Sequence, residues 1–336
     1  MKSIITIDTG TTNTRAVLWQ DGEKVEKDFE PVGVRDTSIT GDKKRLKEAV
    51  KKSIEVVLKD SDVIDHSEVT VIASGMITSD LGLEEVPHLE APVGAFELAY
   101  GMVRKSIPEV FDQPIWFIPG VKNTDKNIWP GSITNMDIMR GEEVEVIGAI
   151  SQLGMSGPAV LILPGSHTKI VKLDRKNCIS GSITTMTGEL MEFLTKKSIL
   201  ADSLDESFTD FLDEDALKLG AKTYTSNGIT RTAFSVRLLD MYTDYSRNQR
   251  ANYLLGSILE NDIMAIRNTE VFSIGSNDPF IILGNQILSQ AFKVLIENNK
   301  FIQGRVITRE IPDLAGLGVI EIAKLRKVEE DKRNET

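Results

Sequence analysis

Two short polar stretches in this 336-residue chain combine glycine, hydroxyl and charged side chains: DTGTTNTR at 8–15 and PGSHTK at 164–169. Glycine lets a backbone approach a ligand closely, consecutive N–H groups in such turns cradle an anion, and hydroxyl groups add further donors. A nearby guanidinium or ammonium group supplies the opposite charge. Both stretches are therefore predicted to bind phosphate groups. The candidate residues are Asp8, Gly10, Thr11, Thr12 and Arg15 in the first stretch, and Gly165, Ser166, His167, Thr168 and Lys169 in the second.

Each polar stretch forms the first turn of a predicted β-hairpin. Apolar strands at 3–8 and 14–20 flank the first stretch, and Asp21-Gly22, a strong hairpin signal, leads to a third strand at 23–30. The second stretch is flanked in the same way by strands at 159–163, 168–174 and 178–183. We expect the two turns to face each other and to hold a polyphosphate from both sides.

The remaining elements repeat around these hairpins. The first half contains an amphipathic helix at 42–59, strands at 69–73 and 115–119, and helices at 95–105 and 141–153. In the second half, helical segments fill about 186–267, followed by strand 280–284, helix 286–299, strand 304–309 and a final helix from Asp313. Apart from the helical insertion, the second half repeats the order of the first. This pattern predicts a duplicated α/β protein with two domains, 1–155 and 156–336, and a cleft between them.

The composition limits the classes of partner. The formal net charge is −11, so a nucleic-acid backbone would be repelled on average, and no such partner is expected. No apolar stretch approaches the roughly 20 residues needed to span a membrane, and the opening MKSIITIDTG lacks the features of a secretory signal. The single cysteine, Cys178, excludes an internal disulfide framework and suits a reducing compartment. We therefore expect a cytoplasmic protein that binds small molecules.

The polar motifs together resemble those of the actin, hexokinase and heat-shock-chaperone superfamily. The stretch at 8–15 is similar to its first phosphate motif, the turn at 164–169 to its second, and ILGNQILSQAF, with Gly284 at a strand end, to its adenosine motif. The resemblance implies two ribonuclease-H-like α/β domains, each with a mixed five-stranded sheet flanked by helices, and an ATP cleft between them. The chain lacks G-x-x-x-x-G-K-[ST], which excludes a P-loop kinase, and lacks G-x-G-x-x-G after a strand, which argues against a dinucleotide site.

Longer strings narrow the resemblance to one family. The chain resembles the 2-keto-3-deoxygalactonate kinase family over essentially its whole length. The matching strings are SGMITSDLGLEEVPHLEAPVG at 74–94, FIPGVKN at 117–123, DIMRGEEVEVIGAI at 137–150, LPGSHTKIVKLD at 163–174 and TGELMEFLTKKSIL at 187–200. One departure is Lys197, where the family usually has histidine. The resemblance implies ATP-dependent phosphorylation of 2-dehydro-3-deoxy-D-galactonate at its terminal C6 hydroxyl, a step of galactonate catabolism.

The resemblance also implies roles for particular side chains. Asp8 would hold Mg²⁺, an ion that prefers oxygen ligands and keeps several waters. Related kinases place a catalytic carboxylate at the start of the helix after the first domain's last core strand, so the candidate general bases are Glu143, Glu142 and Asp137. A carboxylate in a first helical turn is also stabilised by the helix dipole and could serve the helix alone. Arg140 would bind the substrate carboxylate or pair with Glu143.

A sugar acid needs several hydrogen-bond donors, and ligands gather where the strands of α/β sheets end. The candidate substrate-binding residues are Ser74, Gly75, Thr78, Ser79 and Gly94, together with Arg140. His167 would either donate to a phosphate oxygen or serve the structure. Three alternatives stay open: a kinase for another ketodeoxy acid or hexose, an actin-like ATP switch, and a hydrolase of the exopolyphosphatase type. The apolar helical segment near 234–266 could form a homodimer contact.

Overall fold

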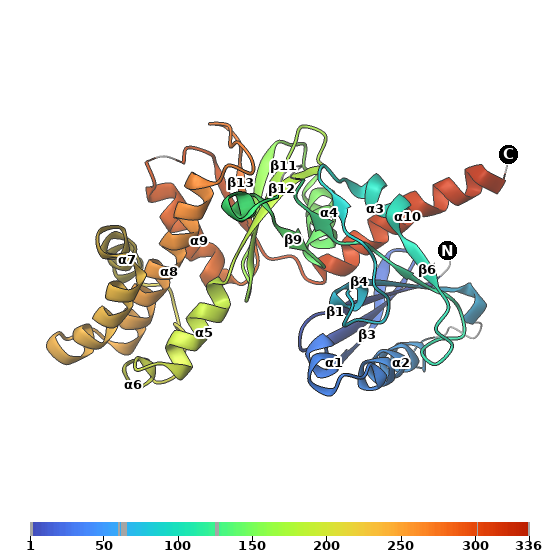
Figure 1. Ribbon diagram of the computed structural model, residues 1–336, viewed down its shortest axis with the longest axis horizontal. Helices are drawn as coiled ribbons and strands as arrows, with labels where there is room; N and C mark the ends of the chain where they lie inside the picture. The colour runs from blue at the N-terminus through green and yellow to red at the C-terminus, as the bar shows by residue number, and fades with distance from the viewer. Residues whose placement is uncertain (1–2, 60, 62–65, 125–127, 301, 335–336) are drawn as a thin grey trace.

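The computed structural model describes residues 3–59, 61, 66–124, 128–300 and 302–334, which form two lobes that meet near the centre of the molecule (Figure 1). The sheet of the first lobe has the strand order β3-β2-β1-β4-β7-β6. Its strands are β1 (Ser3–Thr9), β2 (Thr14–Gln20), β3 (Glu23–Glu30), β4 (Val69–Gly75), β6 (Val103–Lys105) and β7 (Ile115–Phe117). Because β1 pairs antiparallel with β2 and parallel with β4, the sheet is mixed, as predicted.

This first sheet has six strands, and the prediction of five is wrong here. The additional strand, β6, lies within 95–105, where the sequence predicts a helix. Helix α3 (Ala95–Gly101) instead ends at a glycine, which is a poor helix former. Residues Val103–Lys105 then pair antiparallel with β7. The pairing partner is distant in sequence, so local periodicity could not reveal this edge strand.

The sheet of the second lobe has five strands in the order β12-β11-β10-β13-β14, as predicted. They are β10 (Ala159–Leu163), β11 (Thr168–Leu173), β12 (Ile179–Thr185), β13 (Phe280–Leu283) and β14 (Val306–Arg309). The first three strands pair antiparallel, and β10 pairs parallel with β13. This order and these directions repeat those of β3-β2-β1-β4-β7, so the predicted duplication is present in the two sheets.

The helices cover the sheets through apolar faces. In the first lobe, α2 (Lys44–Lys59) buries Leu46, Val50 and Ile54 against β2 and β3. The first half of the chain also contains α1 (Val34–Thr40), which the sequence did not predict, and α4 (Glu142–Leu153), besides α3. The second lobe contains α5 (Thr187–Lys197), α6 (Ala201–Leu204), α7 (Glu214–Tyr242), α8 (Arg247–Asn268) and α9 (Gln286–Asn298). Helices α7 and α8 pack along each other and form an arm at one end of the molecule (Figure 1).

The final helix, α10 (Leu314–Asn334), returns from the second half of the chain to the first lobe. It packs on α4, α3 and β1 (Figure 1). Helices α4 and α10 approach closely because each has glycine at the contact: a Cβ on Gly318 would lie 1.8 Å from the Val144 carbonyl oxygen, and one on Gly148 would lie 2.5 Å from that of Leu314. The division at residue 155 stays a prediction, and α10 crosses it.

A small third sheet lies beside the two large ones and was not predicted. It has the order β5-β8-β9 and consists of β5 (Leu89–Glu90), β8 (Val121–Lys122) and β9 (Ile138–Met139). Its neighbouring residues reach the second lobe, since Val93 forms a bridge with Ile179 and the Asn123 side chain donates to the Ser182 carbonyl. Short 3-10 turns occur at His66–Glu68, Met76–Thr78 and Pro130–Asn135. Among the described residues, no helix is both long enough and apolar enough to cross a membrane.

Candidate active site

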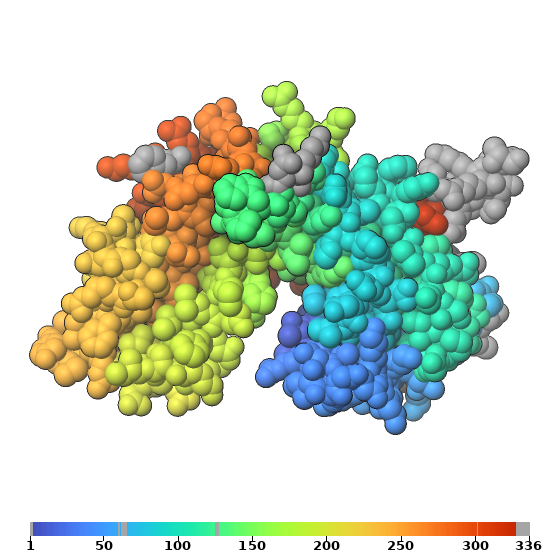
Figure 2. Space-filling view, viewed as in Figure 1, coloured from blue at the N-terminus to red at the C-terminus, as the bar shows by residue number. Residues whose placement is uncertain are grey.

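The surface is hollowed between the segment around α5 and α6 and the segment around α1 and α2, which appear yellow-green and blue (Figure 2). The two predicted phosphate turns belong to the elements on either side: the first turn joins β1 to β2, and the second joins β10 to β11. The first residues of a helix donate N–H groups to the carbonyls of each turn. These hydrogen bonds fix the main chain of both turns.

Helix α1 supports the first turn. The Val34 N–H donates to the Gly10 carbonyl at 3.2 Å, and the Arg35 N–H donates to the Thr11 carbonyl at 2.9 Å. Gly33, just before the helix, lies so close that an added Cβ would be 2.5 Å from the Thr11 carbonyl oxygen. Sequence reasoning missed Gly33. Its position just before an unpredicted helix was the available signal, since glycine can occupy a helix N-cap.

Helix α5 supports the second turn in the same way. The Glu189 N–H donates to the Ser166 carbonyl at 3.1 Å, and an added Cβ on Gly188 would lie 2.4 Å from the Gly165 carbonyl oxygen. At the end of β13, Gly284 lies beside Pro164 of the second turn, and its role in an adenosine site stays a prediction. His167 pairs with the Glu189 carboxylate at 3.0 Å on the exposed surface, which accounts for this histidine without a ligand.

Asp8 and Glu145 face the same region from different elements. Asp8 lies opposite both Arg15 and Ser74 in the sheet register, and its carboxylate is 3.6 Å from the Arg15 guanidinium. Burial raises the pKa of Asp8, while Arg15 opposes the shift. Burial, and then the charges of Asp8 and Glu142, raise the pKa of Glu145 to about 8. The sequence analysis did not include Glu145, although its i, i+3 spacing from Glu142 places both on one helix face.

The three predicted general bases differ in access. Glu143 has no exposed surface, and both of its carboxylate oxygens accept from the Gly141 N–H, at 2.9 and 2.8 Å. Burial raises the pKa of Glu143 to about 8. Asp137 accepts from the hydroxyls of Ser182 and Thr184, so its carboxylate joins the small sheet to the second lobe. Glu142 is partly exposed, and burial raises its pKa while Lys169 opposes the shift.

Two cations expected to meet ligands are already bonded within the protein. The Arg140 guanidinium donates to the Thr78 carbonyl and hydroxyl, at 2.6 and 2.7 Å, and to the Val86 carbonyl at 2.7 Å. The Lys169 ammonium is nearly buried and donates to the Ile138 carbonyl and the Thr184 hydroxyl, at 2.8 and 2.7 Å. In this conformation Arg140 does not pair with Glu143, and most of the donors of both cations are already bonded within the protein.

The predicted substrate residues divide into two groups. Gly75 lies at the site, because an added Cβ would be 2.9 Å from the Asp8 carboxylate, and Gly141 packs against it. Ser74 is buried beside Asp8, and its hydroxyl has no hydrogen-bond partner within the described part of the chain. The other candidates support local structure: the Thr78 hydroxyl donates to the Gly75 carbonyl, the Ser79 hydroxyl donates to the Met76 carbonyl, and the Gly94 N–H donates to Glu97 at the start of α3.

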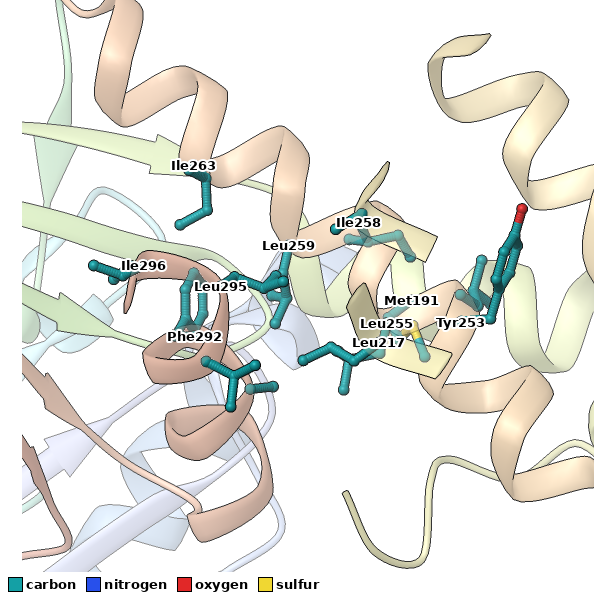
Figure 3. Close-up of a cluster of buried hydrophobic side chains, with 14 of the residues drawn as sticks. Met191, Leu217, Tyr253, Leu255, Ile258, Leu259, Ile263, Phe292, Leu295 and Ile296 are labelled. Atoms are coloured by element: carbon teal, nitrogen blue, oxygen red, sulfur yellow. The ribbon is translucent and has the colours of Figure 1, made fainter. Parts of the chain in front are cut away.

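A cavity of about 410 Å³ opens beside the second turn, between α5, α8 and α9. Its apolar side chains continue the second-lobe core, in which Met191, Leu255 and Phe292 come from three different helices (Figure 3). The polar part of the wall includes Gly165, Thr168 and Asn285, which follows Gly284. A concave, largely apolar pocket with a few polar groups at one end is suited to a small organic ligand.

Comparison with known proteins identifies the family of this chain. Residues 8–317 match the model of the family described as 2-keto-3-deoxy-galactonokinase. The chain belongs to this family. It is 28% identical over 267 residues to the 2-dehydro-3-deoxygalactonokinase of Escherichia coli (strain K12). The matched region covers 79% of this chain and 80% of that relative. The predicted family is therefore confirmed.

Solved structures confirm the fold class. A Sinorhizobium meliloti protein described as a candidate 2-dehydro-3-deoxygalactonokinase matches 97% of this chain and 98% of its own, with a TM-score of 0.72 and 21% identity. A ligand-bound xylulose kinase from Lactobacillus acidophilus matches 97% of this chain and 89% of its own, with a TM-score of 0.50 and 13% identity. At these identities the likeness concerns the fold, which is the two-lobed α/β kinase architecture that the motifs predict.

Proposed function

We propose that this member of the 2-keto-3-deoxy-galactonokinase family transfers the γ-phosphoryl group of ATP to the C6 hydroxyl of 2-dehydro-3-deoxy-D-galactonate, in galactonate catabolism. The observation that carries the proposal is the pair of similarly supported glycine–hydroxyl turns, one in each lobe, with the interacting acidic groups Asp8, Glu142 and Glu145 near the first turn. Phosphoryl transfer depends mainly on positioning and charge stabilisation, which rigid turns and converging polar groups supply.

ATP would lie with its phosphates between the two turns. The N–H groups and hydroxyls of Gly10, Thr11 and Thr12, with the Arg15 guanidinium, would hold them from the first lobe. Gly165, Ser166 and Thr168 would hold them from the second, and the nucleoside would occupy the cavity next to Gly284. The donor set suits a hard cation such as Mg²⁺, because the carboxylate oxygens of Asp8 and Glu145 face one region. Such an ion would neutralise phosphate charge.

We assign the general base to Glu142. Glu143 is inaccessible and Asp137 is bonded to the second lobe, whereas Glu142 is partly exposed at the start of α4. Its raised pKa makes it a better proton acceptor than an ordinary surface glutamate. Gly75 and Gly141 pack against each other between Asp8 and the start of α4, and the sugar acid would bring its hydroxyl to this region. Closure of the lobes would exclude water from this region.

The test is ADP release by the purified protein with Mg-ATP, with and without 2-dehydro-3-deoxy-D-galactonate. We expect strong stimulation by this acid and little by its gluconate-derived epimer or by hexoses. Stimulation by another ketodeoxy acid or a hexose alone would move the assignment to that substrate. ADP release that is indifferent to every sugar acid would overturn the kinase proposal in favour of an ATP switch, and polyphosphate hydrolysis without ATP-dependent transfer would favour a phosphatase.

We also propose that the protein works in the cytoplasm as a homodimer formed through the α7–α8 arm. The arm exposes Leu219, Met241 and Tyr242 along α7, next to an apolar hollow of about 350 Å³. The single cysteine suits a reducing compartment. Light scattering after size-exclusion chromatography would test the dimer. A dimer that Tyr242→Glu converts to monomer supports the arm contact, and a monomeric unmodified protein contradicts it.

A further inference from the structure

The cavity beside the second turn contains two buried hydroxyls that have no hydrogen-bond partner. Thr168 is fully buried and Thr195 is 3% exposed, and neither Oγ1 atom has a partner among the described residues. Both residues line this cavity. An unmatched buried hydroxyl costs free energy, so two in one wall point to a ligand that supplies the missing bonds.

The other polar side chains of the wall are already bonded. The Thr187 hydroxyl donates to the Asp262 carboxylate, and the Asn285 side-chain oxygen accepts from the Ile287 N–H at the start of α9. Glu192 and Lys196 pair with each other at 3.1 Å on the exposed face of α5. Thr168 and Thr195 therefore differ from their neighbours, and they belong to two different elements, β11 and α5.

The positions of Thr168 and Thr195 in the chain place them at different distances from the second turn. Thr168 begins β11, directly after the second turn, where phosphate groups would lie. Thr195 belongs to α5, seven residues after Gly188, which contacts that turn. At a rise of about 1.5 Å per residue, this places Thr195 roughly 10 Å farther along the helix axis. Apolar side chains, among them Met191 and Phe292 (Figure 3), line the same cavity.

We propose that Thr195 binds the adenine base of ATP and that its hydroxyl hydrogen-bonds the amino edge of the ring. The inference rests on the proposed function only in taking ATP as the nucleotide. A flat heteroaromatic ring suits the apolar walls, and a hydroxyl oxygen can accept a hydrogen bond from the 6-amino group of the ring. Thr195 is thus a specificity-determining residue for the phosphoryl donor, while Thr168 serves the phosphate end.

The experiment measures ATP binding directly by calorimetry, without sugar acid, so that it does not depend on the identity of the acceptor. Thr195→Val keeps the shape of the side chain and removes the hydroxyl. We expect it to weaken ATP binding about fivefold, the usual value of one neutral hydrogen bond. Thr195→Ser, which restores a hydroxyl, should bind within about twofold of the unmodified protein.

Two controls make the result specific. Thr37→Val changes another buried, unpartnered threonine, in helix α1 of the first lobe, and should leave ATP binding unchanged. Purine riboside triphosphate lacks the 6-amino group, so it should bind the unmodified protein and Thr195→Val equally. Equal losses in Thr195→Val and Thr37→Val, or no loss in either, would overturn the assignment. If sugar-acid kinase activity is absent but the Thr195-dependent difference in ATP binding persists, only the proposed function fails.

Discussion

The two hairpin turns share a backbone plan but differ in the side chains around them. In each, the helix after the third strand of its half donates an N–H group to the turn, and a glycine at that helix start lies against the turn's main chain. Around the first turn are the charged groups Asp8, Arg15 and Glu145. Beside the second is an apolar cavity with two unpartnered hydroxyls.

This difference shows how the two halves of a duplicated fold can serve different parts of one reaction. The main chain of both turns is suited to phosphate, because it depends on glycine and hydrogen bonds that both halves have kept. The surrounding side chains come from other elements: α4 supplies Glu142 and Glu145 near the first turn, and the helical insertion supplies much of the cavity wall beside the second. We infer that reaction chemistry belongs to the first lobe and nucleoside recognition to the second.

The largest expected effect is a loss of kcat on substitution of Asp8, beside the first turn. Asp8→Asn keeps the size of the side chain but removes its charge, and we expect kcat to fall roughly 100- to 1,000-fold, as when a charge-stabilising group is removed. Asp28→Asn, in the same sheet, is the control and should change kcat by less than about twofold. Steady-state kinetics checks both. A Thr168→Val variant that loses as much kcat as Asp8→Asn would contradict the division between lobes.

A second prediction tests the shared support of the turns. An added methyl group would lie 2.5 Å from the Thr11 carbonyl oxygen in Gly33→Ala and 2.4 Å from the Gly165 carbonyl oxygen in Gly188→Ala. Because these atoms belong to the main chain, each turn must shift, and we expect the KM for ATP to rise about tenfold in both variants. In Gly101→Ala the methyl meets only the Leu89 and Pro119 side chains, so the KM should change little. Loss in only one of the two variants would show that the turns are not supported alike.

A third prediction concerns the helix that supports the second turn. Asp262 in α8 is buried and accepts from the Thr187 hydroxyl at the start of α5, and burial raises its pKa to about 6. The folded protein therefore holds this proton more tightly than the unfolded chain, whose carboxyl titrates near 3.8. Stability from this group is complete below about pH 4 and is lost as the pH rises through about 6.

Asp262→Asn should remove that loss. Urea unfolding at pH 4.5 and 7 should show a variant whose relative stability improves by roughly 1–3 kcal/mol between the two values. Asp278→Asn is a useful contrast, because Asp278 pairs with the buried Lys172 and its pKa is lowered. For Asp278→Asn the relative stability should stay nearly constant over this range, because a lowered pKa confines the pH-dependent part to values below about 3.8. Parallel pH profiles for the two variants would contradict the assigned environments.

The smallest expected effect is at His167, which the sequence placed in the second phosphate motif. Its ring pairs with Glu189 on the exposed surface, and such pairs contribute little. His167→Gln should change kcat and the KM for ATP by less than about twofold. A larger loss, absent in Glu189→Gln, would show that the ring contacts phosphate and would make the two turns more alike than proposed.

Local patterns were sufficient to predict the hairpins and most helices. Asp21 and Gly22 both have positive φ angles, 53° and 85°, as the turn signal predicts, and the apolar face of α2 is buried as its spacing indicates. The fold class and family also follow from motifs that are contiguous in the chain. The short elements were missed: α1, β6 and the small sheet are too brief to show a period, and distant partners stabilise them.

The sequence by itself determined which residue types meet at the two turns, because turn geometry and hairpin pairing depend on neighbours in the chain. Only the tertiary structure decided which polar groups remain available. Arg140 and Lys169 have the right chemistry for anions but are bonded to carbonyl and hydroxyl groups far away in sequence. Nothing in the strings that contain Glu145 and Thr195 singles these two residues out. Folding nevertheless brings Glu145 near Asp8 and leaves the Thr195 hydroxyl without a partner among the described residues, in an apolar cavity. A side chain's partners are set by the packing of whole elements, which no local stretch encodes.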